Sequence, residues 1–261
     1  TETNALTKLK SMIDDPVTYP VFTSNQDAAI LKVSGIEPNV SPWGRAIDFT
    51  TFPAASEFFI DNLNKFNDPR RAVFNTQARS KDGMTTIGYK GIPSAYVGSD
   101  SQFDFLPSNH NIALVTAPMV CVIMTYAEVE FIKAELAQKG VITANAKTHY
   151  EAGVTAAIEQ WDADVPVDYF ETPAAAYDGT LERVMLQKYY ALYFNDYQQW
   201  FEYRRTGLPA LPTTDAMLND RRMPVRFKYP VVVQTNNASN YARAVESMGG
   251  DDINTKVWWE K

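Results

Sequence analysis

The sequence predicts a mainly α protein in which long irregular loops separate the helices. Helix caps followed by apolar residues at helical spacing recur along the chain, most clearly in segments 56–66, 126–139, 146–161 and 181–205. Two of these segments are joined by a short connection, which is typical of an antiparallel helix hairpin. Glycine and proline interrupt residues 75–118, where no helical period survives. The chain therefore combines a helical scaffold with a long irregular segment.

Composition limits the classes of function. A chain of 261 residues with 45% hydrophobic and 21% charged residues can bury a sizeable core as one domain. The net charge is −7 and the isoelectric point is near 4.9, so the chain offers no basic surface for phosphates. We therefore expect no nucleic-acid partner. No apolar run is long enough to span a bilayer.

The helix hairpin is predicted from its caps and its apolar faces. Thr125 and Glu128 have the spacing of a capping box, in which side chains satisfy the free N–H groups of the first turn. Gly140 can end the first helix. In the second helix, residues from Tyr150 to Trp161 form one apolar face.

A long aromatic helix is predicted over residues 181–205. Thr180 is a suitable N-cap, Gly207 can adopt the left-handed conformation that closes a helix, and Pro209 prevents it from resuming. Its apolar side chains fall on two stripes, and a helix that is apolar on more than one side is expected to be buried between neighbours. The stripes comprise Leu186, Tyr190, Tyr193, Tyr197 and Phe201, and Met185, Tyr189, Leu192 and Trp200.

Catalytic and metal-binding motifs are missing from the sequence. The single cysteine, Cys121, cannot form an intramolecular disulfide and lies among apolar residues, so we expect a core position. His110 and His149 have no Cys, His or Glu at a metal spacing. We therefore expect no metal, no cofactor and no enzymatic activity. A pair of carboxylates assembled in space, as in a glycoside hydrolase, stays open as an alternative.

The irregular loops between residues 40 and 110 are rich in aromatic, amide and carboxylate side chains. Flat rings can cover the C–H face of a sugar, and polar side chains can bind its hydroxyls. The alternative is that each ring packs its own loop onto the helices. The candidate ligand-binding residues are Trp43, Tyr96, Tyr89, Phe103 and Asn109.

Seven motifs, spread collinearly over the chain, carry a resemblance to a known family. The sequence resembles the C-terminal half of SusD/RagB-like proteins, the nutrient-capturing surface lipoproteins of Bacteroidetes-type outer membranes. One departure is Val233, where the family commonly has Glu. The motifs are NDPR (67–70), YAEVEFIKAELAQKG (126–140), HYEAGVTAAIEQW (149–161), WFEYRRTGLP (200–209), MPVRFKYP (223–230), NNASNYARAV (236–245) and GGDDINTKVWW (249–259).

The resemblance implies a SusD-like scaffold of tetratricopeptide-like helix pairs with long loops. It implies non-catalytic binding of an oligosaccharide at the bacterial cell surface, and delivery to a SusC-like TonB-dependent transporter. It also implies an outer-membrane, surface-exposed lipoprotein. Family members begin with a lipidated cysteine and an N-terminal half that this sequence lacks, so we expect residues 1–261 to form a single C-terminal domain or fragment.

Three alternatives to this function stay open. One is a peptide-binding member of the same family, and another is an α-helical glycoside hydrolase. The third is a tetratricopeptide-type adaptor that recognises proteins only. The family motifs belong to the scaffold, so the resemblance does not identify the ligand-binding residues.

Overall fold

The computed structural model describes residues 2–41, 49 and 54–258, and it is mainly helical, as predicted. The helices are α1 (Glu2–Asp14), α3 (Glu57–Phe66), α4 (Arg70–Phe74), α5 (Tyr126–Gln138), α6 (Ala146–Glu159), α7 (Leu181–Ala191), α8 (Gln198–Thr206), α9 (Val231–Asn236) and α10 (Ala238–Met248). The strands are β1 (Ala29–Val33), β2 (Arg79–Ser80), β3 (Phe105–Leu106) and β4 (Met119–Met124). Short 3-10 turns are η1 (Asn25–Asp27), η2 (Asp100–Gln102), η3 (Ile112–Val115) and η4 (Tyr169–Glu171).

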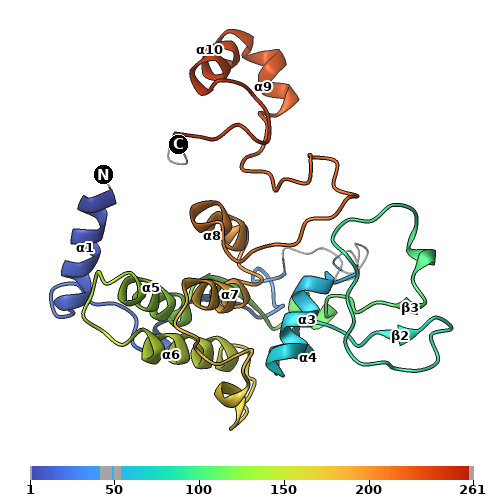
Figure 1. The fold of residues 1–261 in the computed structure, drawn as a ribbon, viewed down its shortest axis with the longest axis horizontal. Coiled ribbons are helices and arrows are strands. Elements are labelled where there is room, and N and C mark those ends of the chain that lie inside the picture. The colour runs from blue at the N-terminus through green and yellow to red at the C-terminus, as the bar shows by residue number, and fades with distance from the viewer. Residues whose placement is uncertain (1, 42–48, 50–53, 259–261) are drawn as a thin grey trace.

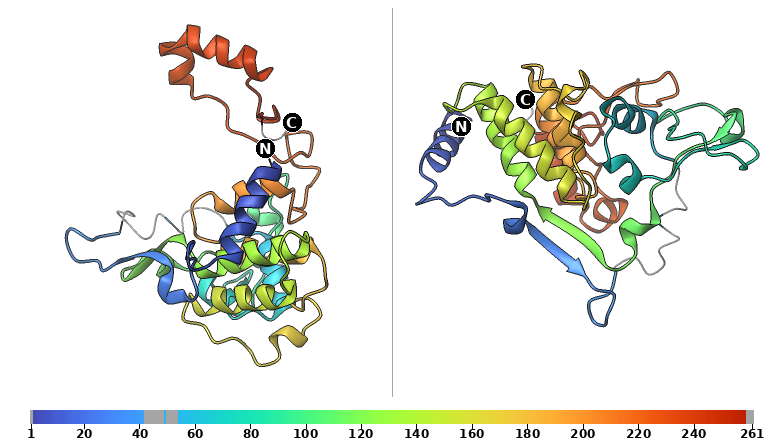
Figure 2. Two further views of the ribbon diagram at one scale, coloured as in Figure 1. Left: turned by 90° about the vertical axis from the view of Figure 1, so that its left-hand side faces the viewer. Right: turned by 90° about the horizontal axis from the view of Figure 1, so that it is seen from below.

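Helices α5, α6 and α7 pack side by side and form the main helical body (Figure 1). Helices α3 and α4 lie at one end of this body, and the loops that carry β2 and β3 extend beyond them (Figure 1). Helices α9 and α10 project away from the helical body, as Figure 1 and the left panel of Figure 2 show. None of the described helices is long and apolar enough to cross a membrane.

The core lies where α3, α5, α6 and α7 meet. Tyr190 of α7 is fully buried, its ring lies 5.0 Å from that of Phe59, and its hydroxyl donates to the Phe59 carbonyl at 3.0 Å. Helices α5 and α6 approach closely because Gly153 faces the ring of Phe131, which a Cβ at this position would meet at 3.1 Å. Aromatic rings and one small residue thus determine the packing of the helices.

The predicted helix caps are present. The hydroxyl of Thr180 accepts from the N–H of Arg183 at 3.1 Å, and that of Thr125 accepts from the N–H of Glu128 at 3.1 Å. Gly207 takes a φ of 74° and closes α8, as predicted. Each of these caps depends only on neighbours in sequence, which is why the sequence could reveal it.

The prediction of one continuous helix over residues 181–205 is wrong. Helix α7 ends at Ala191 and α8 begins at Gln198. Between them, Phe194 and Asp196 adopt left-handed backbone angles, with φ of 63° and 45°, which a continuous helix cannot contain. The Asn195 side chain, which is buried, points its amide toward the carbonyl of Ile123.

The rings of the second half are also less buried than predicted. Tyr197 and Phe201 expose 52% and 42% of their surface, and α8 contains no fully buried residue. Because the break changes the direction of the chain, these rings lie outside the core into which α7 packs. Both rings contact Trp200, and Tyr197 also contacts the exposed ring of Phe227.

Strands β1 and β4 form a two-stranded antiparallel sheet, which Figure 2 shows below the helical body. The segment AAILKVSG, residues 28–35, is compatible with a short strand or a turn from its sequence, and in the structure residues 29–33 of it form a strand. Cys121 lies opposite Leu31 in this sheet. It is half-buried rather than a full core residue, because Leu31 is itself 54% exposed and leaves that side of the sheet uncovered.

Two residues of the NDPR motif, Asp68 and Arg70, form a buried ion pair. Both side chains of Asp68 and Arg70 are fully buried, and the guanidinium donates to both carboxylate oxygens, at 2.9 and 2.6 Å. Tyr169 also donates to Asp68 at 2.6 Å, and Gln187 of α7 accepts from Arg70 at 3.1 Å. The motif thus links α4, α7 and η4.

Candidate functional site

The loop region between α4 and α5 is organised by a hairpin at Asp82-Gly83. Gly83 takes a φ of 74°, and its N–H donates to the Ser80 carbonyl at 2.8 Å. The Asp82 carboxylate accepts from the Ser80 hydroxyl at 2.6 Å and from the Met84 N–H at 2.9 Å. These bonds close a turn and place residues 85–88 beside residues 78–80.

Arg79 is at the centre of this small sheet. It forms a bridge with Thr86 on one side and pairs with Leu106 of β3 on the other. Residues directly opposite each other on antiparallel strands project to the same face. Arg79, Thr86 and Leu106 therefore share one face, while the neighbouring residue Ala78 is fully buried on the opposite face.

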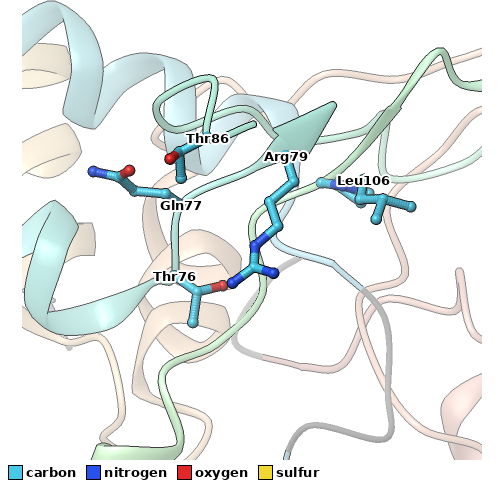
Figure 3. A pocket seen from close by; sticks show the side chains of 6 residues that line it. Thr76, Gln77, Arg79, Thr86 and Leu106 are labelled. Atoms are coloured by element: carbon cyan, nitrogen blue, oxygen red, sulfur yellow. The ribbon is translucent and has the colours of Figure 1, made fainter. Parts of the chain in front are cut away.

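The shared face forms a cleft of about 310 Å³. We call it the loop cleft, and it is lined by Thr76, Gln77, Arg79, Thr86, Leu106 and Pro107. Figure 3 shows the Arg79 side chain reaching across the cleft toward the hydroxyl of Thr76. A cleft of this volume is at the small end of ligand sites and has room for about one sugar ring.

One wall of the loop cleft is hydrogen-bonded to the irregular segment that carries Asn109. The Asn109 N–H donates to the Thr76 hydroxyl at 3.1 Å, and the Thr76 N–H donates to the Asn109 carbonyl at 2.8 Å. The Asn109 side chain accepts from the N–H of His110 at 2.8 Å. Of the predicted binding residues, Asn109 thus lies beside the cleft and holds one of its hydroxyls.

The loops that carry the cleft are attached rigidly to α3. The N–H of Glu57 donates to the Ile92 carbonyl at 2.7 Å. Gly91 permits this approach, because a Cβ there would lie 2.5 Å from the backbone of Ser56 and Glu57. A binding surface on loops held by a rigid scaffold is a common arrangement of functional sites.

Tyr96 and Phe103 are brought together by the structure. Their ring centroids are 5.0 Å apart at 82°, and the Tyr96 hydroxyl bonds to Asp100. Phe103 in turn contacts Phe105, which lies next to Leu106 in β3 and so projects to the face opposite the loop cleft. These rings and the loop cleft therefore form two separate candidate surfaces.

The remaining predicted residues lie elsewhere. Tyr89 is half-buried, with the guanidinium of Arg71 4.9 Å from its ring centroid, and its carbonyl accepts from Asn64 at 2.9 Å. It is thus placed against α3 and α4. Trp43 lies outside the described residues.

Sequence reasoning missed Gln77, Arg79 and Thr86. The Asp82-Gly83 pair is a hairpin signal, and the alternation of Gln77 and Arg79 with buried Ala78 is the pattern of a half-buried strand. Both signals are present in the sequence, but the strands are too short for a period to stand out. The partner across the sheet, Leu106, cannot be found from local pattern at all.

A larger groove, of about 950 Å³, lies between α1, α5, α7 and α8. Its charged side chains bind one another: Lys188 pairs with Glu202 at 2.9 Å, and Arg205 pairs with Glu135 at 2.6 Å. Burial raises the pKa of Glu128 at the same groove, although nearby Lys188 opposes the shift. This pattern indicates an internal charge network.

Titratable groups in the described residues do not form a catalytic constellation around the loop cleft. No group of three or more potential metal ligands occurs among the residues that the structure describes. His110 shares a hydrogen bond of 2.8 Å with the Tyr193 hydroxyl, and burial lowers the pKa of its imidazole. This pair lies within the aromatic packing around Phe74.

Comparison with known proteins identifies related families and folds. A model of the SusD-like family, described as starch-binding and associating with the outer membrane, matches residues 1–230. No curated protein matches the chain.

Solved structures share the fold over nearly the whole chain. A SusD homologue of Bacteroides thetaiotaomicron has a TM-score of 0.79 and 26% identity, covering 100% of this chain and 61% of its own. A chitin-binding protein has a TM-score of 0.77 and 24% identity, with coverages of 100% and 60%. A chitin-binding SusD homologue from Flavobacterium johnsoniae has a TM-score of 0.78 and 22% identity, with coverages of 97% and 58%. The chain thus spans 58% to 61% of the length of these structures.

Proposed function

We propose that this chain, which belongs to the SusD-like family of starch-binding proteins associated with the outer membrane, binds an oligosaccharide without cleaving it. The loop cleft carries this proposal, because it joins polar and apolar side chains on one face of a sheet. Two structural neighbours are chitin-binding proteins, which supports a glycan as the ligand class.

The chemistry of the loop cleft suits one sugar ring. Leu106, which is 43% exposed, and Pro107 can cover an apolar C–H face. The hydroxyl of Thr86 and the carboxamide of Gln77 can each donate and accept hydrogen bonds with sugar hydroxyls. The Thr76 hydroxyl already donates to the Asn109 carbonyl and accepts from the Asn109 N–H, so it keeps one lone pair for a sugar hydroxyl. The chain thus supplies both kinds of contact that sugar recognition requires.

The aromatic loops extend the proposed binding region. Tyr96 and Phe103 are half-buried and form a ring pair on a neighbouring surface, where they can contact further sugar units. Trp43 and Tyr89 remain in the proposed set, and Asn109 contributes by holding Thr76.

Delivery to a membrane transporter completes the proposed function. The family is described as associating with the outer membrane, which supports passage of a bound oligosaccharide to an uptake protein there. We propose a SusC-like TonB-dependent transporter as that partner, and a surface-exposed lipoprotein as the form of the whole protein.

Isothermal titration calorimetry with chito- and malto-oligosaccharides tests the binding proposal. Gln77→Ala should weaken binding about three- to tenfold, the loss of one net hydrogen bond. Gln26→Ala is the matched control, because Gln26 is an exposed glutamine on η1, distant in sequence from the cleft. Equal loss in both variants, or none in Gln77→Ala, would exclude the cleft as the site.

Peptide binding is the second candidate function. Extended peptides would be expected to use backbone hydrogen bonds along a strand edge, whereas sugars would depend on the side chains of the cleft. Saturable binding of a peptide library pool, together with no response to any oligosaccharide, would favour this alternative.

A further inference from the structure

Arg79 is a charged group without a charged partner in the loop cleft. Arg79 is exposed, and among the residues that the structure describes its guanidinium makes no ion pair and no side-chain hydrogen bond. Every other residue that lines the cleft is uncharged. The cleft therefore presents a positive charge within a neutral wall.

Most of the described arginines, unlike Arg79, have an acidic partner. The protein has 31 acidic and 24 basic residues, so acceptors for arginine are abundant. Six described arginines form ion pairs with Asp or Glu, namely Arg70, Arg183, Arg205, Arg221, Arg222 and Arg226. Arg71 and Arg243 have no acidic partner but donate to the side chains of Asn64 and Asn240, whereas Arg79 has neither kind of contact.

Two acidic residues near Arg79 in sequence, Asp82 and Asp100, form hydrogen bonds with other residues. Asp82 accepts from Ser80 and Met84 within its own turn. Asp100 accepts from the hydroxyl of Tyr96. The donors of the exposed Arg79 guanidinium thus remain available to a group from outside the chain.

The position of Arg79 is also fixed by the sheet. Its backbone is paired on both sides, with Thr86 and with Leu106, so the guanidinium projects from the middle of the cleft face. A guanidinium presents a rigid, planar fork of donors that matches a carboxylate bidentately. Flanking hydroxyls and the apolar Leu106 leave the remainder of the cleft suited to a sugar ring.

We propose that the loop cleft selects an anionic saccharide, in which a hexuronate carboxylate pairs with Arg79. This inference rests on the proposed function, because it specifies the ligand class of the same site. A sulfate ester offers the same charge and fork-matching oxygens, so it is the second source of the required anion.

Calorimetry with matched ligands tests the inference. Tetragalacturonate should bind about two- to fivefold more tightly than its methyl ester, since esterification removes an ion pair with an exposed guanidinium. Arg79→Gln should abolish this preference, and Arg79→Lys should restore only part of it. A sulfated oligosaccharide of similar length should show the same dependence on Arg79 if sulfate is the natural anion.

Arg222→Gln is the control variant, because Arg222 is exposed and pairs with Asp220. Its preference for the acid should equal that of the wild type. Salt adds a second readout: raising ionic strength should weaken tetragalacturonate binding by the wild type more than by Arg79→Gln.

The outcomes separate the two proposals. Neutral oligosaccharides that bind wild type and Arg79→Gln equally, with no preference for the acid, would overturn the anionic inference and leave glycan binding intact. No binding of any saccharide, neutral or anionic, would overturn both.

Discussion

Asp68 and Arg70 form an ion pair in which both charged side chains are fully buried. Burial alone raises the pKa of the Asp68 carboxyl, but the adjacent Arg70 and the hydrogen bonds from Arg70 and Tyr169 outweigh it and hold the pKa below its ordinary value. The carboxylate is thus charged at neutral pH and compensates a fully buried guanidinium.

Replacing Asp68 with Asn should therefore destabilise the fold strongly. Because Arg70 would keep its charge without a partner, we expect a loss of about 3–5 kcal/mol in the free energy of unfolding. Urea denaturation at neutral pH measures it. Asp220→Asn, at an exposed ion pair, is the control and should change stability by less than about 0.5 kcal/mol.

Two tyrosines from the same predicted helix give a second test at this scale. Tyr190 is fully buried and its hydroxyl is bonded to Phe59, whereas Tyr197 exposes 52% of its surface. Tyr190→Ala should cost about 3–5 kcal/mol, the usual effect of emptying a buried aromatic site. Tyr197→Ala should cost less than about 1 kcal/mol. Thermal melts that give equal losses would contradict the observed break between α7 and α8.

At the scale of elements, α8 is connected to the helical body by charge. Arg205 donates to both carboxylate oxygens of Glu135 on α5, at 2.7 and 2.6 Å. Burial raises the pKa of Glu135, but the hydrogen bonds and charges of Arg205 and Lys139 outweigh it and lower the pKa to about 2. Since α8 buries no side chain fully, this ion pair is a principal attachment of α8.

The stability of this attachment should depend on pH. A carboxyl with a lowered folded pKa contributes stability above its ordinary pKa of 4.5, and the contribution is lost as pH falls toward about 2. We expect Glu135→Gln to cost about 1–2 kcal/mol at neutral pH, a figure discounted because Arg205 is 43% exposed.

Urea denaturation at several pH values checks this prediction. Between about pH 5 and pH 2.5 the wild type should lose more stability than Glu135→Gln, since the variant has no carboxyl to protonate at this site. Parallel stability curves for the two proteins would show that the ion pair does not contribute.

At the scale of the whole molecule, a helical body supports loops through backbone bonds such as that between Glu57 and Ile92. Polar and apolar groups meet in the loop cleft without an acid pair or a metal cluster among the described residues. The meeting of polar and apolar groups in one cleft is compatible with the starch-binding description of the family.

The purified protein should therefore release no product from polysaccharides. Assays for reducing ends, with starch, chitin and pectin as substrates, should give no signal above a heat-denatured control. Turnover that a single Asp or Glu substitution abolishes would instead favour the α-helical glycoside hydrolase.

The sequence by itself determined the helical class, most helix ends and the family. Caps at Thr125 and Thr180 and the stop at Gly207 depend on hydrogen bonds within a few residues, so local pattern is enough to find them. The collinear motifs between residues 67 and 259 likewise identify the family, which the family model confirms over residues 1–230.

Only the tertiary structure decided the break after Ala191 and the position of the loop cleft. The break depends on left-handed residues whose surroundings include the distant carbonyl of Ile123. The cleft depends on the pairing of Arg79 with Thr86 and Leu106, which are brought together across strands. Aromatic composition does not distinguish buried rings from ligand-binding rings, because the exposure of a ring depends on segments that are distant in the chain.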